Sequence, residues 1–272
     1  MATANNPYPV QGIDPGLIRQ IRQASQATNT DFGLLMAQAK QESGFRPDAK
    51  ATTGSAAGLF QFIDSTWLDM VRQFGAKHGA GDLAQQITLD GSGKPQVGDA
   101  ATRQKILALR ADPQLSAALA GEYAKQNQSE LERALGRSIG RADIYMAHFL
   151  GAGGAATFLK ALASHGGTAA ADLLPDAAAN NRAIFFDGET GRAKSVAEIY
   201  RSLGQRIDAE AQSFSAADGA DLPVAPLAFP PRLDFAGLRL SQPVASMLDL
   251  MSVAALKLVG ADPAAPRNHR SL

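Results

Sequence analysis

Helix start and stop signals recur along this chain and constrain its fold more than any other feature. Asp14 is followed by Pro15, which joins an acidic N-cap to a proline suited to the first helical position. Asp31 begins a second helix, over 32–43, and Gly44 ends it. We therefore expect a mainly α-helical fold, with further helices at 66–74, 99–110, 113–135, 142–150 and 155–165.

Two segments interrupt the helical pattern. Residues 78–98 are rich in Gly and Asp, which favours a long loop or a small flap. Residues 181–194 contain a Gly turn and predict a small extra hairpin. Ser195 and Glu198 then have the spacing of a capping box, which predicts a helix to about residue 214.

The composition changes near residue 215, where the chain becomes rich in Pro, Ala and Leu. One apolar stretch of this tail, 244–259, has the spacing of a helix. We therefore predict three parts: an N-terminal extension at 1–13, a helical domain at 14–214, and a linker with a C-terminal docking helix at 215–272.

Charge and composition exclude several classes of function. The 26 basic and 26 acidic residues cancel, so no global field attracts nucleic acid, and a neutral polysaccharide or another protein suits the chain better. The chain has no cysteine, which excludes disulfides and thiol catalysis. Four histidines show no paired-ligand spacing, so we expect no metal site: His78, His148, His165 and His269.

Export and membrane signals are also missing from the sequence. The segment from Met1 to Pro7 lacks the basic and apolar regions of a signal peptide. The most apolar stretch, 244–259, is broken by Asp249 and Lys257, so no transmembrane segment is expected. The export route stays open.

Glu42 is the residue most suited to chemistry. It shares one face of the 32–43 helix with Leu35 and Ala39, so we expect its carboxyl to lie against the core. Burial and the negative end of the helix dipole both favour the protonated form of such a group. A protonated carboxyl is what glycosidic cleavage requires, because the leaving sugar oxygen must receive a proton. The alternative is a solvated glutamate beside Lys40 and Gln41.

A loop of small residues follows this helix. Residues 54–58 read Gly-Ser-Ala-Ala-Gly, which lets a bulky chain approach the backbone closely. Gln61 adds an amide able to bind hydroxyl or acetamide groups. Trp67, the only tryptophan, fits a core role better than sugar stacking.

These motifs together resemble the catalytic domain of the soluble lytic transglycosylases, which are related to goose-type lysozyme. Glu42-Ser43 is followed by Gly58-Leu59-Phe60-Gln61 and then by a Ser-Thr-Trp helix start, as in that family. The resemblance covers about residues 14–165 and places the third family motif at residues 147–151, Ala-His-Phe-Leu-Gly.

The resemblance implies a lysozyme-like α-fold that cleaves the MurNAc-β-1,4-GlcNAc bond of peptidoglycan in the bacterial periplasm or cell wall. It implies that Glu42 is the single acid and base, that the product carries a 1,6-anhydromuramic end, and that no cofactor takes part. It further implies that Ser43 contacts substrate or orients Glu42. The residues implied to line the central subsites are Gly58, Leu59, Phe60 and Gln61.

The third motif departs from the family pattern. His148 stands where the family has a tyrosine that supports the catalytic glutamate, and Phe149 stands in place of an asparagine. A histidine can donate a hydrogen bond to Glu42, and it can equally be a satisfied core residue. Tyr145 or Tyr123 can supply the phenol instead.

Two other functions remain open from the sequence. A lysozyme-type muramidase would use the same glutamate with water, and its second carboxylate would be Asp48 or Asp64, although Asp64 suits a helix cap better. A non-catalytic glycan-binding or assembly protein of a cell-envelope machine would fit the altered third motif and the tail. A flagellar or secretion-system component is then the expected partner of the tail.

Overall fold

The computed structural model describes residues 12–52 and 54–218. The predicted docking helix at 244–259, and all but the last two residues of the predicted N-terminal extension, lie outside the described residues. Within them the fold is mostly helical and agrees with a lysozyme-like α-helical domain, as the sequence predicted.

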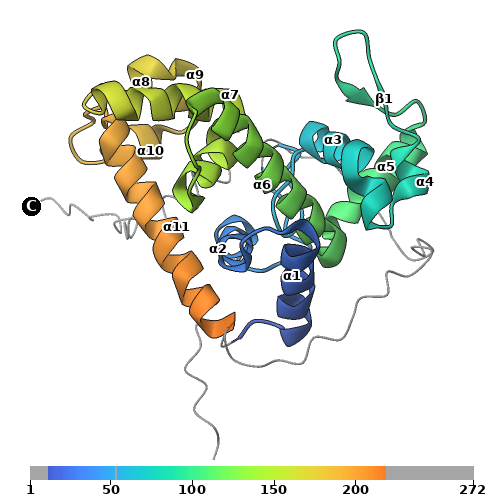
Figure 1. The fold of residues 1–272 in the computed structure, drawn as a ribbon. Helices are drawn as coiled ribbons and strands as arrows, with labels where there is room; N and C mark the ends of the chain where they lie inside the picture. The colour runs from blue at the N-terminus through green and yellow to red at the C-terminus, as the bar shows by residue number, and fades with distance from the viewer. Residues whose placement is uncertain (1–11, 53, 219–272) are drawn as a thin grey trace, which may run out of the picture.

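Seven longer helices carry the fold, and shorter turns of helix join them (Figure 1). The longer helices are α1 (Pro15–Thr28), α2 (Phe32–Ser43), α3 (Asp64–Phe74), α5 (Ala100–Ala108), α6 (Pro113–Leu135), α7 (Arg141–His165) and α11 (Val196–Asp218). The shorter ones are α4 (Gly81–Ala84), α8 (Ala170–Leu173), α9 (Pro175–Asn180), α10 (Arg182–Phe185) and the 3-10 turns η1 (Gly75–His78) and η2 (Leu109–Ala111).

The structure confirms most of the helix ends that the sequence predicted. The Asp14 and Asp31 side chains accept hydrogen bonds from the backbone N–H groups of Gly16 and Leu34, at 2.9 Å and 2.7 Å. Gly44 ends α2 in the left-handed conformation, with φ 59°. The helices expected at 142–150 and 155–165 form the single element α7, in which Gly151 alone has non-helical angles (φ 71°, ψ 159°). The two expected helices are therefore one helix with a kink at Gly151.

Asp64 does not cap α3 as the sequence suggested. The N-cap of α3 is Ile63, and its side chain accepts no capping hydrogen bond. The Asp64 carboxylate instead pairs with the guanidinium groups of Arg103 and Arg110, at 2.7 Å and 2.9 Å. The Asp64 side chain is therefore used in ion pairs with two other segments and not in a local helix cap.

The structure has a hairpin that the sequence did not specify. Strands β1 (Thr88–Leu89) and β2 (Pro95–Gln96) pair antiparallel, with Thr88 opposite Gln96. They belong to the Gly- and Asp-rich stretch expected to be a loop or flap, and they project from the molecule beside α3 and α5 (Figure 1). The segment 181–194, expected to be a small hairpin, begins with α10 and ends in a short antiparallel turn, in which Phe186 bridges Ala193 and the Asp187 and Lys194 N–H groups donate to the Arg192 and Phe185 carbonyls at 2.8 Å.

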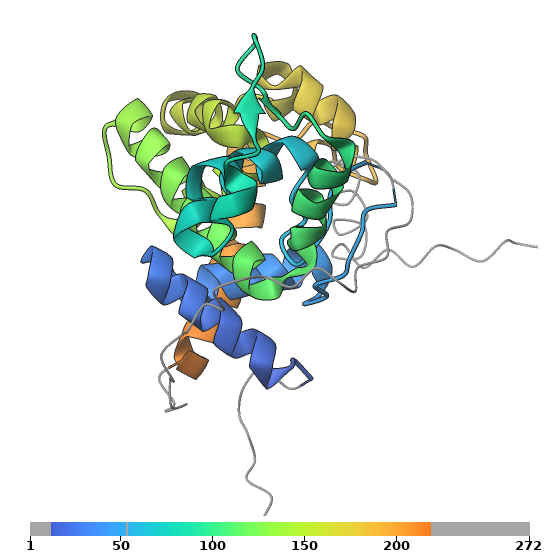
Figure 2. The same cartoon turned by 90° about the vertical axis from the view of Figure 1, so that its right-hand side faces the viewer.

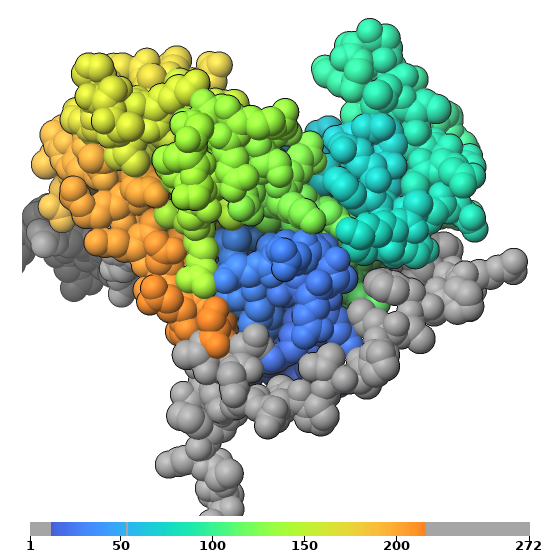
Figure 3. Space-filling view, in the orientation of Figure 1, coloured from blue at the N-terminus to red at the C-terminus, as the bar shows by residue number. Residues whose placement is uncertain are grey.

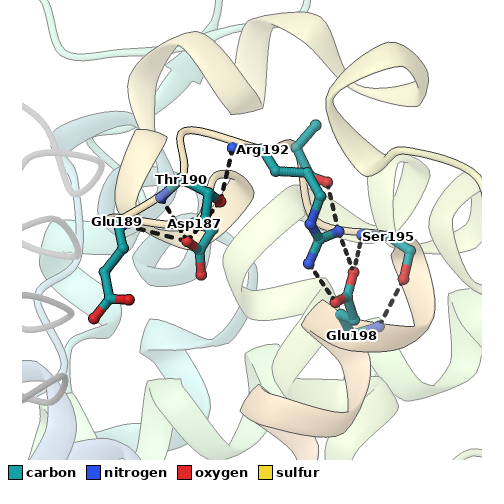
Figure 4. A network of polar contacts seen from close by, with 7 residues as sticks. Asp187, Glu189, Thr190, Arg192, Ser195 and Glu198 are labelled. Carbon is teal, nitrogen blue, oxygen red and sulfur yellow. Dashed lines mark hydrogen bonds and ion pairs between the residues drawn. The ribbon is translucent and has the colours of Figure 1, made fainter.

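Side-chain hydrogen bonds fix that turn and the start of α11 (Figure 4). The Asp187 carboxylate accepts from the backbone N–H and the hydroxyl of Thr190, at 2.9 Å and 2.8 Å. Ser195 and Glu198 form the predicted capping box, with backbone-to-side-chain bonds of 2.7 Å and 3.2 Å. The α11 helix then runs past the expected end near 214 to Asp218.

Helix α2 lies in the middle of the fold, with α1, α6 and α11 packed around it (Figures 1 and 2). Ten of its twelve residues are buried, from Phe32 to Ser43. Trp67 of α3 is fully buried and donates its indole N–H to the Ile106 carbonyl at 2.7 Å, which confirms the core role expected for it. Among the described residues, no helix has the length and apolar character that crossing a membrane requires.

Close approach of α1 and α6 depends on Gly121, and alanine there is predicted to destabilise the fold. An added Cβ would lie 2.3 Å from Thr28 Oγ1. That hydroxyl is held by a 2.7 Å bond to the Ala24 carbonyl, so it has little room to move. We expect Gly121→Ala to lower the free energy of unfolding by about 1–3 kcal/mol in urea titrations.

Gly153→Ala is the matched control, because Gly153 is also helical but has nothing within 4 Å of its added Cβ. It is expected to leave stability unchanged or raise it by up to about 1 kcal/mol through helix propensity. Equal behaviour of the two variants would contradict the proposed close packing.

Candidate active site

Glu42 lies in the last turn of α2 with only 3% of its surface exposed. The expected apolar face is present, since Leu35 and Ala39 are fully buried. The Glu42 carboxylate oxygen Oε1 lies 3.2 Å from Nε2 of His148, in α7, within hydrogen-bonding distance. The structure therefore brings together the residues of the first and third sequence motifs, which are 106 positions apart.

Two tyrosines flank His148, whose side chain is 8% exposed. The Tyr145 ring stacks on the imidazole with centroids 6.2 Å apart, and the Tyr123 ring meets it edge-on at 6.4 Å. The Tyr145 hydroxyl accepts a short hydrogen bond from the Gln41 side chain. Tyr145 and Tyr123, the two phenols named as alternatives to His148, both lie against its ring. The side chain within hydrogen-bonding distance of Glu42 is that of His148.

Both phenols keep their protons at neutral pH. Burial raises the pKa of Tyr145 well above its usual range, and the nearby Glu42 charge acts in the same direction. Burial also raises the pKa of Tyr123. The immediate surroundings of Glu42 therefore contain neutral aromatic hydroxyls and one imidazole.

The Ser43 hydroxyl makes its hydrogen bonds within the protein. The Ser43 Oγ lies 2.9 Å from the Leu59 carbonyl and 3.0 Å from the Ala39 carbonyl, and it accepts from the Arg46 backbone N–H at 3.1 Å. Its hydrogen bonds connect the end of α2 to the loop of the second motif. In this geometry Ser43 fixes the loop beside Glu42.

The side chains of the second motif face inward. Leu59, Phe60 and Gln61 are at most 1% exposed. The Gln61 amide nitrogen donates to the carbonyls of Gly58 and Ala49, at 2.7 Å and 3.2 Å. The amide expected to face sugar hydroxyls is thus used to hold the loop, and the residues Gly58 to Gln61 are buried as a whole.

Arg110 clamps the same loop, a role that the sequence did not reveal. Its guanidinium pairs with Asp64 and donates to the carbonyls of Ser55 and Phe62. The Arg110 carbonyl lies 2.1 Å from the place where a Cβ on Gly58 would stand. Arg110 is itself buried, and its partners lie in other segments of the chain.

A small pocket adjoins the Glu42–His148 pair. Its walls come from α2, α6, α7 and the second-motif loop, and they include Gln38, Phe60, Phe62, Tyr123, Asn127 and His148. Gln38 and Asn127 were not singled out from the sequence, because an amide inside a helical pattern carries no local signal. On the outer surface, Figure 3 shows a hollow. One of its sides bears α3, α5 and the hairpin, and the other side is the C-terminal half of α6.

Two of the other acidic groups near these elements are paired with cationic side chains. Glu122 of α6 is buried, and it contacts His78 Nε2 at 3.0 Å and Lys77 Nζ at 2.5 Å. Asp64 is held by two arginines. Asp48 is exposed at the surface. In the described part of the chain, no three His, Cys, Asp or Glu side chains gather as metal ligands would.

Comparison with known families agrees with this geometry. Residues 19–85 match the family described as "Transglycosylase SLT domain". This range holds Glu42 and the Gly58–Gln61 loop, and the resemblance to the soluble lytic transglycosylase catalytic domain is thereby confirmed. The match supports a lytic transglycosylase type of function in general terms and implies peptidoglycan, in the cell envelope, as the substrate.

Gly58→Ala is predicted to disrupt the loop beside Glu42. The new Cβ would strike the Arg110 backbone, and the φ of +82° is strained for any residue with a side chain. We expect the free energy of unfolding to fall by about 3 kcal/mol or more. Urea titration measures this change.

The matched control is Gly93→Ala, at a hairpin position with φ +79° and nothing within 4 Å of the added Cβ. It carries the backbone strain alone and is expected to cost about 1–2 kcal/mol. A Gly58→Ala variant no less stable than Gly93→Ala would show that the contact with Arg110 is unimportant.

Proposed function

We propose that the chain is a peptidoglycan lytic transglycosylase that cleaves the MurNAc-β-1,4-GlcNAc bond with Glu42 as its single acid and base. The observation that carries the proposal is the buried Glu42 carboxyl and its 3.2 Å contact with His148. Family resemblance supports the reaction class, because the matched range includes Glu42 and the adjacent loop. The proposed place of action is the periplasm or cell wall.

In the proposed reaction Glu42 first gives its proton to the glycosidic oxygen, and the bond between that oxygen and the muramic C1 breaks. The resulting carboxylate then accepts the proton of the muramic 6-hydroxyl, and the O6 oxygen bonds to C1. The product is a 1,6-anhydromuramic end, and no water is consumed. One carboxyl thus serves as acid and then as base.

The state of the other carboxylates favours this route over hydrolysis. A glycosidase with two carboxylates needs the second one free to hold water or to attack C1. Of the two candidates named from the sequence, Asp64 is held by Arg103 and Arg110, and Asp48 is exposed at the surface whereas Glu42 is buried. An intramolecular hydroxyl needs no second carboxylate, which suits this arrangement.

His148 is proposed to orient the Glu42 carboxyl. Its Nε2 contacts Glu42 Oε1, and the stacked Tyr145 ring limits rotation of the imidazole. The buried loop Gly58–Gln61, which the resemblance implied to line the central subsites, is proposed to support Glu42 from behind, with Ser43 and Gln61 holding it in place. In this proposal the third motif still supports the glutamate, although its residue types differ from the family's.

Glu42→Gln is predicted to abolish turnover of purified peptidoglycan sacculi. The amide has no proton to give to the leaving oxygen, so we expect a loss of about 10³-fold or more. Release of soluble muropeptides measures the rate, and circular dichroism checks the fold. Glu189→Gln, at an exposed glutamate of the 187–191 turn, is the matched control and should keep full activity.

Mass spectrometry of the released fragments decides the route. Anhydromuramic products, lighter by one water than hydrolytic products, are expected. Products of full mass would show a muramidase that uses the same glutamate. Binding to sacculi without any released fragment would show a non-catalytic glycan-binding protein.

His148→Ala is predicted to lower kcat about 10–100-fold with little change in KM, because it removes the group that orients Glu42. His148→Tyr restores a hydrogen-bond donor, and we expect it to recover most of the activity. A His148→Phe variant keeps a ring of similar size without a polar atom, and it is expected to lose as much activity as His148→Ala. Unchanged kcat in His148→Ala would contradict the positioning role.

A further inference from the structure

Helix α11 lies outside the range that matches the family, yet it packs along α2, the helix that carries Glu42 (Figure 1). Its contacts reach both ends of α2. Near the beginning of α2, a Cβ on Gly33 would lie 2.2 Å from the Ala211 carbonyl of α11. Near the end of α2, Lys40 Nζ lies 3.1 Å from Glu210 Oε1. Helix α11 therefore supports α2 over its whole length.

These contacts lie on the side of α2 away from the Glu42 carboxyl. Successive residues of an α-helix are turned by about 100°, so Lys40 lies about 200° around the helix from Glu42. Gly33 is seven positions before Lys40, which places it within about 20° of the same face. The connection from α11 to the proposed acid is therefore the backbone of α2 and the turn that follows it.

That turn has an unusual backbone conformation. Gly44 and Phe45 both have positive φ angles, 59° and 63°. Glycine adopts such angles readily, whereas a bulky side chain does so at a cost in energy. The Phe45 N–H donates to the Ala39 carbonyl at 3.2 Å. A strained residue of this kind persists where the surrounding structure holds it, and such residues cluster at functional sites.

The ring of Phe214, in α11, packs against Phe45. The two ring centroids are 6.0 Å apart and the ring planes meet at 86°, an edge-to-face arrangement that aromatic pairs favour. Phe214 is only 1% exposed, and Lys40 Nζ lies 5.9 Å from the centroid of its ring. The ion pair between Lys40 and Glu210 is partly exposed, and such pairs contribute little by themselves. The buried ring is therefore the main contact that holds Phe45.

Hydrogen bonds connect the Phe45 turn to the candidate active site. Arg46 donates its backbone N–H to Ser43 Oγ at 3.1 Å and its Nε–H to the Ser43 carbonyl at 2.9 Å. The same Ser43 Oγ lies 2.9 Å from the Leu59 carbonyl of the second-motif loop. A shift of the Phe45 turn would therefore move Ser43, the chain neighbour of Glu42, together with its contact to the loop.

We propose that Phe214 is a positioning residue for the reaction at Glu42. Its ring fixes the Phe45 turn, and that turn fixes the end of α2 that carries the carboxyl. The inference rests on the proposed function, because it takes Glu42 as the reacting group. It makes α11 part of the catalytic unit, although the family match ends at residue 85.

Phe214→Ala in the full-length chain tests this role. Turnover of purified sacculi is measured at a temperature at which circular dichroism shows every variant folded. We expect kcat to fall about tenfold with little change in KM, because Glu42 is displaced from a glycan that still binds. Phe214→Leu keeps most of the buried volume and should recover most of the lost activity. A Phe214→Ala variant with the kcat of the parent overturns the proposal.

Tyr200→Phe is the matched control on the same helix. It removes the 3.0 Å hydrogen bond from the Tyr200 hydroxyl to the buried Asp143 carboxylate. The substitution lies about 21 Å from Phe214 along α11, at 1.5 Å per residue. It should lower the unfolding temperature and leave kcat at the value of the parent. An equal loss of kcat in Tyr200→Phe would show an effect of general stability and would also overturn the proposal.

Hydrogen exchange read by mass spectrometry tests the anchor without any turnover. Phe214→Ala should speed amide exchange about tenfold in peptides that cover residues 39–62, and Tyr200→Phe should leave these peptides unchanged. Unchanged exchange in Phe214→Ala overturns the proposal. A parent chain that leaves sacculi intact contradicts the proposed function, and the exchange result still decides whether Phe214 holds the turn.

Discussion

The burial of α2 is the constraint on which the rest of this structure depends. A helix that is buried on nearly every side needs neighbours on every side, and α1, α6 and α11 supply them. Gly33 allows α11 to approach α2 closely, since a Cβ on Gly33 would lie 2.2 Å from the Ala211 carbonyl of α11. Glu42 is buried as a consequence, because it ends a helix that has almost no exposed face.

Two side chains hold the second-motif loop beside the C-terminal end of α2. Ser43 contacts the Leu59 carbonyl from α2, and Arg110 donates to the Ser55 and Phe62 carbonyls from η2. Asp64 neutralises Arg110, whose pKa is lowered by burial and only partly restored by that carboxylate. The loop is therefore preorganised by charge and hydrogen bonds, and it gives the C-terminal end of α2, with Glu42, a fixed support.

Local signals predicted the parts of this fold that depend on a few neighbouring residues. Asp31, Gly44 and the Ser195–Glu198 capping box act within four positions of themselves, and each is where the sequence placed it. Asp64 does not cap α3, and Arg110 was not recognised as a residue that holds the loop, for one reason: their partners come from other elements. Gln61 and Asn127 could not be assigned either, since which amide faces a pocket is decided by packing across the fold.

The departure of the third motif from the family pattern has a structural consequence. A tyrosine beside a glutamate is a neutral donor at all physiological pH values, whereas an imidazole can exchange a proton in that range. Here the imidazole lies between two phenols whose pKa values are raised by burial, and it contacts Glu42 on its other side. Two neutral tyrosines around one histidine leave the imidazole nitrogen as the polar atom that reaches Glu42. The histidine therefore keeps a polar contact with the proposed acid, and the tyrosines fix the plane of its ring instead of contacting the carboxylate themselves.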